Sequence, residues 1–374
     1  MSNAVSKLFK SRFGVRLAVP AVVAVGAVGT AFVYPQVVSA STPTLASETT
    51  SQVIASAVAP TAKIYSGTVV ETSGLGLPSS FVNQLTGSTT SGLSQLMVQA
   101  LTSGVTANFW TDHVSNLRVQ VPSSTGEFDL YASSGSVWEW DSATNTATSI
   151  TLPTGTQSQT STTTTSTTPP SPSTIADSLL ANLPAGATVT FAAPQYVAGQ
   201  AAYVLDLAPN DPSSLIGSAQ VAVDASTGNV LGVWITPTGA TSPAFSVSYS
   251  AVSFTAPSSS VFDFTVPSGA TVKTETLGGT SSTSTSTTSN SITHKTIGSG
   301  FSAVEVVTGL PQSSTSGTST LMSSLLSSGT QVTTGIGSGT IITTSVATVF
   351  VGSNGTLAFG AVPQSVMMAD LGQG

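Results

Sequence analysis

Alternation of apolar and polar residues with a period of two runs through most of this sequence, and it constrains the fold more than any other feature. Successive side chains of a β-strand point to opposite faces, so this alternation gives a strand one apolar and one polar face. Turn clusters such as "SSG" (133–135) and "DASTGN" (224–229) separate the segments at hairpin spacing. The pattern predicts a mainly β protein built as an antiparallel meander. The alternating segments are 62–72, 114–121, 127–132, 188–193, 201–208, 219–225, 231–237, 244–254 and 261–267.

Three short segments carry apolar residues at helical spacing instead. The clearest are 91–104 and 172–184, and a weaker pattern covers 319–329. Because their stripes are apolar, these helices must dock on another part of the molecule. We expect the first two to cover the apolar face of the sheet. Their stripes include Leu96, Met97, Leu179 and Leu180.

Residues 1–40 carry the features of an export signal. Basic residues precede the apolar run 17–33, and the small residues of "VVSA" (37–40) offer a cleavage site after Ala40. The alternative is an uncleaved membrane anchor, although a helix of this length spans about 25 Å, less than the ~30 Å hydrocarbon core. Either case predicts an extracytoplasmic protein, secreted or held at the cell envelope by its N-terminal helix.

The charge balance argues against nucleic acid as a partner. After residue 40 the sequence contains four basic residues and all 15 acidic residues. It therefore has no cationic stripe that could neutralise phosphates. The sequence also has no cysteine, which excludes disulfides and thiolate metal ligands, so core packing must hold the exported chain together.

Low-complexity segments divide the chain into parts. The stretches 154–173 and 274–296 are rich in Ser and Thr and lack apolar residues that could bury a face, which is typical of flexible insertions and linkers. A similar tether occupies 41–60. The predicted main domain therefore spans 61–273, with 154–173 as an insertion. Residues 297–374 form a C-terminal β extension that packs on the domain or continues it.

Three segments occur in an order that is typical of one known superfamily. They are "NFWTDHVSNLRVQVPSSTGEFDLYASSGSVWEWDSATNTATSI" (108–150), "AAYVLDLAPNDPSSLIGSAQVAVDASTGNVLGVWI" (201–235) and "VFDFTVPSGATV" (261–272). Together they resemble the LolA-like superfamily of lipoprotein carriers, which includes LppX and the sensor domain of RseB. The resemblance is greatest to the LolA-like proteins of high-GC Gram-positive bacteria.

The resemblance implies a curved antiparallel open half-barrel of about eleven strands, with helices covering its concave face. An apolar cavity would then bury the acyl chains of a lipid or a lipidated protein. The alternative function is that of an RseB-like regulatory sensor domain. Such a domain binds an anti-sigma factor or another envelope protein, including one anchored in the membrane.

One position departs from the superfamily pattern. Carriers place a basic residue shortly after the strand tryptophan, here Trp110, where it helps to hold the covering helices shut. His113 occupies that place in this sequence, so a latch at this position would depend on pH. The alternative is an exposed histidine on a turn.

The densest aromatic segment, "SVWEWD" (136–141), allows two interpretations. Glu139 and Asp141 would lie about 6.6–7 Å apart on one strand, a separation that suits an inverting glycosidase. Carboxylates that point in parallel cannot flank a scissile bond from opposite sides, so we expect both on a solvated outer face. Trp138 and Trp140 would then occupy the inner face, as core or as cavity lining.

The sequence offers no catalytic, metal or cofactor site. His294 lies in a predicted linker, and the chain neighbours Asp112 and His113 diverge on a strand. The sequence "GIGSGT" (335–340) leads into a β pattern rather than a helix that could hold phosphate. We therefore expect a binding protein that is not an enzyme and uses no cofactor. Its cavity and lid candidates are Trp110, His113, Trp138, Trp140, Leu96, Met97, Leu179 and Leu180.

Overall fold

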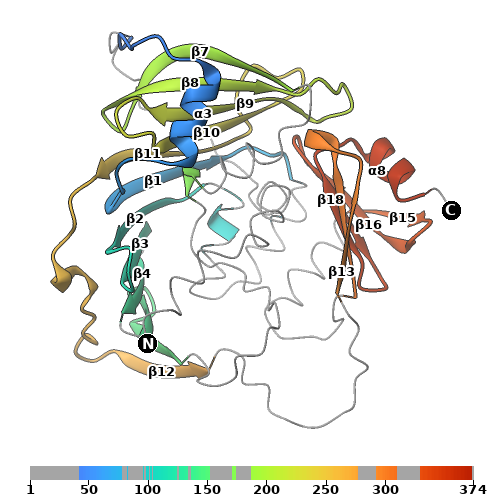
Figure 1. Cartoon of the computed structure of the whole chain (residues 1–374). Helices are drawn as coiled ribbons and strands as arrows, with labels where there is room; N and C mark the ends of the chain where they lie inside the picture. Colours follow the sequence, from blue (N-terminus) through green and yellow to red (C-terminus); the bar gives the residue numbers. More distant parts are fainter. Residues whose placement is uncertain are drawn as a thin grey trace.

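Two β-sheets make up most of the part of the chain that the structure, a computed structural model, describes (Figure 1). No helix among the described residues is both long and apolar enough to cross a membrane. The described residues are 42–77, 104–123, 126–133, 136–151, 171–173, 187–276, 292–309 and 329–372, with helical positions at 82, 96, 98–100 and 102.

The larger sheet has twelve strands in the order β12-β6-β5-β4-β3-β2-β1-β11-β10-β9-β8-β7. Neighbouring strands among β1–β11 are antiparallel, whereas β12 joins β6 in parallel. The strands are β1 (Ser66–Ser73), β2 (Thr106–Thr111), β3 (Leu117–Ser123), β4 (Gly126–Ser133), β5 (Ser136–Asp141), β6 (Thr146–Thr151), β7 (Thr188–Val197), β8 (Gln200–Ala208), β9 (Ile216–Asp224), β10 (Val230–Pro237), β11 (Phe245–Ser253) and β12 (Thr271–Thr276).

This sheet is open, with β12 and β7 as its end strands, and Figure 1 shows it curving from one to the other. The prediction of a mainly β protein with a curved, open antiparallel sheet is confirmed. The larger sheet has twelve strands rather than about eleven, because β12 adds a parallel strand beside β6.

The C-terminal part forms a second, antiparallel sheet of six strands in the order β13-β14-β18-β17-β16-β15. It adjoins the larger sheet through backbone hydrogen bonds from Leu215 to Ala361 (2.8 Å) and from Ser345 to Leu75 (2.9 Å). Its elements are β13 (Thr293–Ile297), η2 (Gly300–Ser302), β14 (Val304–Thr308), β15 (Thr330–Thr334), β16 (Gly337–Thr343), β17 (Thr348–Gly352), β18 (Leu357–Gly360) and the helix α8 (Gln364–Asp370).

Two strands begin or end inside the range expected as a linker, 274–296. β12 extends to Thr276 and β13 begins at Thr293. Both are edge strands, and the side chains of β13 are largely exposed. Backbone pairing with one neighbour forms such a strand without an apolar face, so a search for apolar periodicity does not detect it.

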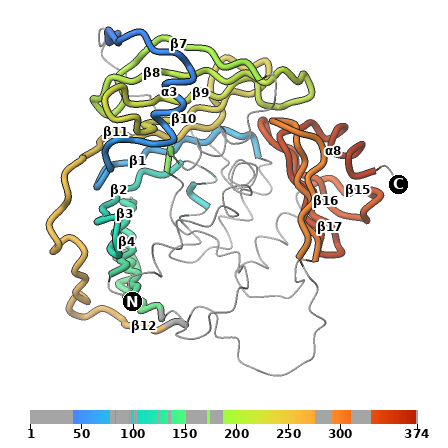
Figure 2. Tube along the Cα trace, in the orientation of Figure 1, coloured from blue at the N-terminus to red at the C-terminus, as the bar shows by residue number. Residues whose placement is uncertain are grey.

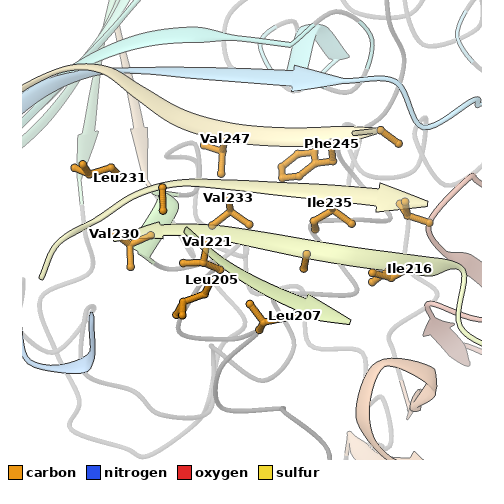
Figure 3. Packing of buried hydrophobic residues seen from close by; sticks show 14 of the residues in the cluster. Leu205, Leu207, Ile216, Val221, Val230, Leu231, Val233, Ile235, Phe245 and Val247 are labelled. Carbon is orange, nitrogen blue, oxygen red and sulfur yellow. The ribbon is translucent and has the colours of Figure 1, made fainter. Parts of the chain in front are cut away.

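The register of the larger sheet sets which side chains share a face. Leu205, Val221, Val233 and Val247 lie directly opposite one another across β8–β11, and the row continues to Glu71 on β1. Figure 3 shows the four apolar members of this row packed together. We call the face that carries this row the inner face, and the opposite one the outer face.

The segment 261–267, expected to form a strand, crosses the outer face instead. It begins in the short 3-10 helix η1 (Ser259–Phe262), where Phe262 is buried, and Phe264 packs against Tyr131 and Trp138. Figure 2 shows the chain between β11 and β12 running outside β2–β4. The alternation of Phe262 and Phe264 therefore belongs to a segment that packs on the sheet without pairing with it. We call residues 259–267 the strap.

The range expected as a tether, 41–60, contains the helix α3 (Thr50–Val58). The Thr49 hydroxyl accepts a hydrogen bond from the Gln52 backbone N–H, and the Gln52 side chain accepts one from the Thr49 N–H, which forms a capping box. Val53 and Ala57 are buried in the main core. The motif "TTSQ" at 49–52 is the sequence signal that could have predicted this helix.

Thr49→Ala should lower the free energy of unfolding by about 1 kcal/mol, because the N-cap hydrogen bond to Gln52 is lost. Urea unfolding followed by circular dichroism measures this change. Ser51→Ala, at an exposed helical position, is the matched control and should change the free energy much less. Equal losses in both variants would contradict a capping role for Thr49.

The described helical positions 96, 98–100 and 102 agree with the helix predicted at 91–104. Of the helix predicted at 172–184, residues 172 and 173 are helical, and the remainder lies outside the described residues. Residues 1–40, 319–328 and most of the insertion 154–173 also lie outside the described residues.

Candidate functional site

Two further rows of directly opposed side chains cross the inner face from β1 to β6. Both begin with apolar residues and end with polar ones on β5 and β6. The first row joins the opposed pair Val69 and Ala107 to the opposed run Val121, Phe128, Asp141 and Thr146, and Ala107 and Val121 belong to one apolar cluster. The second consists of Phe109, Val119, Leu130, Glu139 and Thr148. The inner face of β1–β4 is therefore an apolar surface with a polar border.

Helical side chains cover part of this apolar surface. Leu96 and Ala100 pack against a cluster formed by Val105 and buried residues of β2–β4, and Val98 is buried in the main core. At these positions the segment expected as a helix at 91–104 packs on the sheet. Met97, Leu179 and Leu180 lie outside the described residues.

One carboxyl group, that of Glu71, lies within the apolar rows. Glu71 is only 6% exposed, with Val247 directly opposite it on β11. Within the described part of the chain, its carboxyl group has no hydrogen-bond or ion-pair partner. Burial raises the pKa of Glu71 to about 7, so the group is largely protonated below neutral pH.

The sequence itself carries a signal for the burial of Glu71. Glu71 is two residues from Val69 on the same strand, so its side chain points to the same, apolar face. The next charged residue along the chain is Asp112, so the sequence in between supplies no counter-ion. Tyr249, which shares this face, is also buried, and burial raises its pKa to about 12.

The two acids of β5 lie on the inner face, so the expectation that they occupy a solvated outer face was wrong. Glu139 is opposite Leu130, and Asp141 is opposite Phe128. One carboxylate oxygen of Asp141 accepts hydrogen bonds from the backbone N–H groups of Ala143 (3.0 Å) and Thr144 (3.2 Å). Asp141 thus stabilises the β5–β6 turn. Among the described residues, no group of three or more His, Cys, Asp or Glu could hold a metal ion.

The tryptophans of β5 lie on the outer face, which corrects the expectation that they occupy the inner one. Trp110, Arg118, Tyr131 and Trp138 form a directly opposed row on that face. The Arg118 guanidinium carbon lies 5.1 Å from the Trp110 ring centroid and 4.8 Å from that of Tyr131. Trp140 is buried and pairs with Asp129. The strap that crosses this face gives the aromatic side chains a partner there.

The Arg118–Asp129 ion pair belongs to the same face. The Arg118 Nε and Nη2 atoms donate to one Asp129 carboxylate oxygen at 3.0 and 2.9 Å, and Asp129 is 1% exposed. Burial raises the pKa of Asp129, and the hydrogen bond and positive charge of Arg118 counteract only part of that rise. Arg118 therefore keeps a deeply buried carboxylate compensated.

His113 lies exposed on the turn between β2 and β3, with a φ of 58°. Its Nε2 atom is 2.8 Å from the carbonyl oxygen of Ile64, and its ring meets that of Tyr65 edge-on at 5.0 Å. Asp112 holds the turn by accepting three backbone hydrogen bonds, which lower its pKa despite partial burial. These contacts match the exposed histidine on a turn, and none of them involves a described residue of 91–104.

An aromatic hollow of about 220 Å³ opens on the outer face beside the strap. Tyr131, Trp138 and Phe264 are half-buried around it, and the Phe264 ring centroid lies 5.0 Å from that of Tyr131 and 5.4 Å from that of Trp138. The other lining residues are Ser133, Ser136, Phe262 and Asp263. Trp138 thus lines a hollow, but one on the opposite side of the sheet from the helical cover.

No family model matches this sequence, and no curated protein matches it. Among solved structures, the chain is similar to MucB in complex with MucA(peri), with 11% identity and a TM-score of 0.39 over 86% of this chain and 95% of that one. The MucA/MucB complex of Pseudomonas aeruginosa gives 12% identity and a TM-score of 0.40 over the same shares of the two chains.

A third similar structure is the LolA superfamily protein NE2245 from Nitrosomonas europaea. The match has 12% identity and a TM-score of 0.21, and it covers 58% of this chain and 99% of that one. All these TM-scores lie below 0.5. The function proposed below therefore rests on the geometry of the inner face.

Proposed function

We propose that this protein is an extracytoplasmic binding protein, without enzymatic activity, that buries the acyl chains of a lipid or a lipidated protein on the inner face of β1–β4. The observation that carries the proposal is the pair of apolar rows across these strands, together with the helical side chains Leu96 and Ala100 that pack on them. Ligand sites for small molecules are mostly apolar with a few polar groups that fix orientation.

The polar border supports an amphiphilic ligand. The rows change from Phe128 and Leu130 on β4 to Asp141 and Glu139 on β5. An acyl tail would lie along β1–β4, and its polar head would face β5 and β6. Each buried CH₂ group contributes about 0.8 kcal/mol, so a chain of ten to twelve carbons supplies roughly 8–10 kcal/mol before entropic losses.

Native mass spectrometry of the full chain purified from its own envelope tests the proposal. We expect a population whose extra mass corresponds to lipid, identified by extraction and a second mass measurement. Protein without any bound lipid would contradict the proposal. A co-purifying envelope protein in place of lipid would favour the regulatory alternative, in the manner of MucB, which was solved in complex with MucA.

Leu130→Gln should weaken binding of a fluorescent acyl probe by about tenfold, because it removes apolar contact area from the middle of the second row. Titration of the probe into the variant measures the change. Trp138→Phe, on the outer face of the neighbouring strand, is the control and should leave the affinity unchanged. If Trp138→Phe loses affinity for the probe and Leu130→Gln does not, the acyl site lies on the outer face instead.

A further inference from the structure

The aromatic hollow of the outer face is separate from the acyl site, which lies on the other face of the sheet. Three half-buried rings from separate parts of the chain line it: Tyr131 on β4, Trp138 on β5 and Phe264 on the strap. The buried Phe262 fixes the strap against the sheet beside them. The hollow is therefore built from packed side chains, although its rings remain partly accessible.

The polar groups around the hollow offer acceptors rather than donors to a ligand. The Ser136 hydroxyl donates to the Ser133 carbonyl oxygen (2.8 Å), and the Ser133 hydroxyl donates to the Asn116 side-chain oxygen (2.7 Å). The protons of both serines are therefore already used. Asp263 is exposed at the hollow, and within the described part of the chain its carboxylate has no hydrogen-bond or ion-pair partner.

The electrostatics of the hollow favour a cation. The face of an aromatic ring carries negative potential, and the free carboxylate of Asp263 adds a full negative charge. None of the described residues that line the hollow is basic. The nearby Arg118 is neutralised by Asp129, and it already shows how this row holds a cation, since it lies between the rings of Trp110 and Tyr131.

We infer that the aromatic hollow formed by Tyr131, Trp138, Phe264 and Asp263 binds a quaternary ammonium group. Aromatic walls supply few hydrogen-bond acceptors, so they suit a weakly hydrated quaternary ammonium better than a primary ammonium, which loses its bonds to water. The volume of about 220 Å³ accommodates a trimethylammonium group with the carbons attached to it. The site is independent of the acyl site, because it lies on the opposite face of the sheet.

Isothermal titration calorimetry of the full chain with choline tests the inference, with 3,3-dimethyl-1-butanol as the uncharged molecule of the same shape. We expect choline to bind at least tenfold more tightly than the neutral compound. Equal binding of the two compounds, or no binding of choline, would overturn the inference. Preferential binding of a neutral monosaccharide at this hollow would also overturn it.

Variants locate the binding event. Trp138→Leu should weaken choline binding about tenfold and Trp138→Phe less, because Phe retains a smaller π-face. Asp263→Asn should weaken it severalfold without affecting folding, because its side chain is exposed. Trp140→Phe, on the same strand and face but outside the hollow, is the matched control and should bind as the wild type does. Unchanged binding in both Trp138→Leu and Asp263→Asn would overturn the assignment to this hollow.

Co-sedimentation with vesicles distinguishes the two sources of such a group. Binding to phosphatidylcholine vesicles but not to phosphatidylglycerol vesicles, lost in Trp138→Leu, would support a lipid headgroup as the ligand. Choline binding without vesicle binding would support a free small molecule. The acyl probe titration of Leu130→Gln reports on the other face, so failure of either proposal leaves the other standing.

Discussion

Arg118→Met is expected to lower the free energy of unfolding by about 3–5 kcal/mol at neutral pH. The substitution keeps an apolar side chain of similar length between Trp110 and Tyr131 but removes the cation. Asp129, only 1% exposed, then holds a carboxylate without its ion-pair partner. Urea unfolding monitored by tryptophan fluorescence measures the change. The loss should become smaller at acidic pH, where Asp129 is protonated.

A double variant separates the charge from the packing. Arg118→Met combined with Asp129→Leu removes both members of the ion pair, so no uncompensated charge remains in the sheet. Replacement of a buried ion pair by apolar residues is often neutral or stabilising. We therefore expect the double variant to recover most of the lost stability. If it is as unstable as Arg118→Met alone, the ring contacts of Arg118 rather than its charge stabilise this face.

The second large effect concerns pH and Glu71. The pKa of Glu71 rises from its ordinary value of 4.5 to about 7 in the folded protein, so the folded state binds more protons than the unfolded state between these values. The stability that the protonated group provides is fully present below pH 4.5 and is lost as the pH rises through about 7. From pH 4 to pH 9 this group alone should lower the free energy of unfolding by about 3 kcal/mol.

Glu71→Gln isolates this contribution, because the amide is nearly isosteric and does not titrate. Urea unfolding between pH 4 and pH 9 should show a curve that is flatter than that of the wild type by about 3 kcal/mol. Thr72→Ala, the next residue on the same strand, removes no titrating group and should keep the wild-type pH dependence. A Glu71→Gln curve parallel to that of the wild type would mean that another group produces the pH dependence.

Much of the fold could be predicted from local sequence, because the alternation of apolar and polar residues is visible within each strand. The hairpin of β9 and β10 lies where "DASTGN" predicted a turn, and the apolar stripe of Leu96 and Ala100 packs on the sheet as a helical cover. The helix α3 was missed although its capping box at Thr49 is a local signal. The edge strands β12 and β13 could not be detected by periodicity, because backbone pairing alone defines them.

The candidate site shows where local sequence stops being sufficient. Alternation establishes that Trp138 and Trp140 share one face of β5 and that Glu139 and Asp141 share the other, and the structure agrees. Alternation does not say which face is inner. Apolar tryptophans suggested an inner position, but the strap with Phe264 covers the outer face and provides apolar partners there.

The sequence by itself thus determined most of the alternating strands of the larger sheet and the pairs of side chains that share a face, because a period of two is a property of each strand alone. The tertiary structure decided which segments cover each face of the larger sheet. The position of Glu71 among apolar rows depends on strands far apart in sequence, since Val247 lies opposite it. The aromatic hollow likewise exists only because Phe264, after β11, packs against Tyr131 on β4 and Trp138 on β5, which no local pattern specifies.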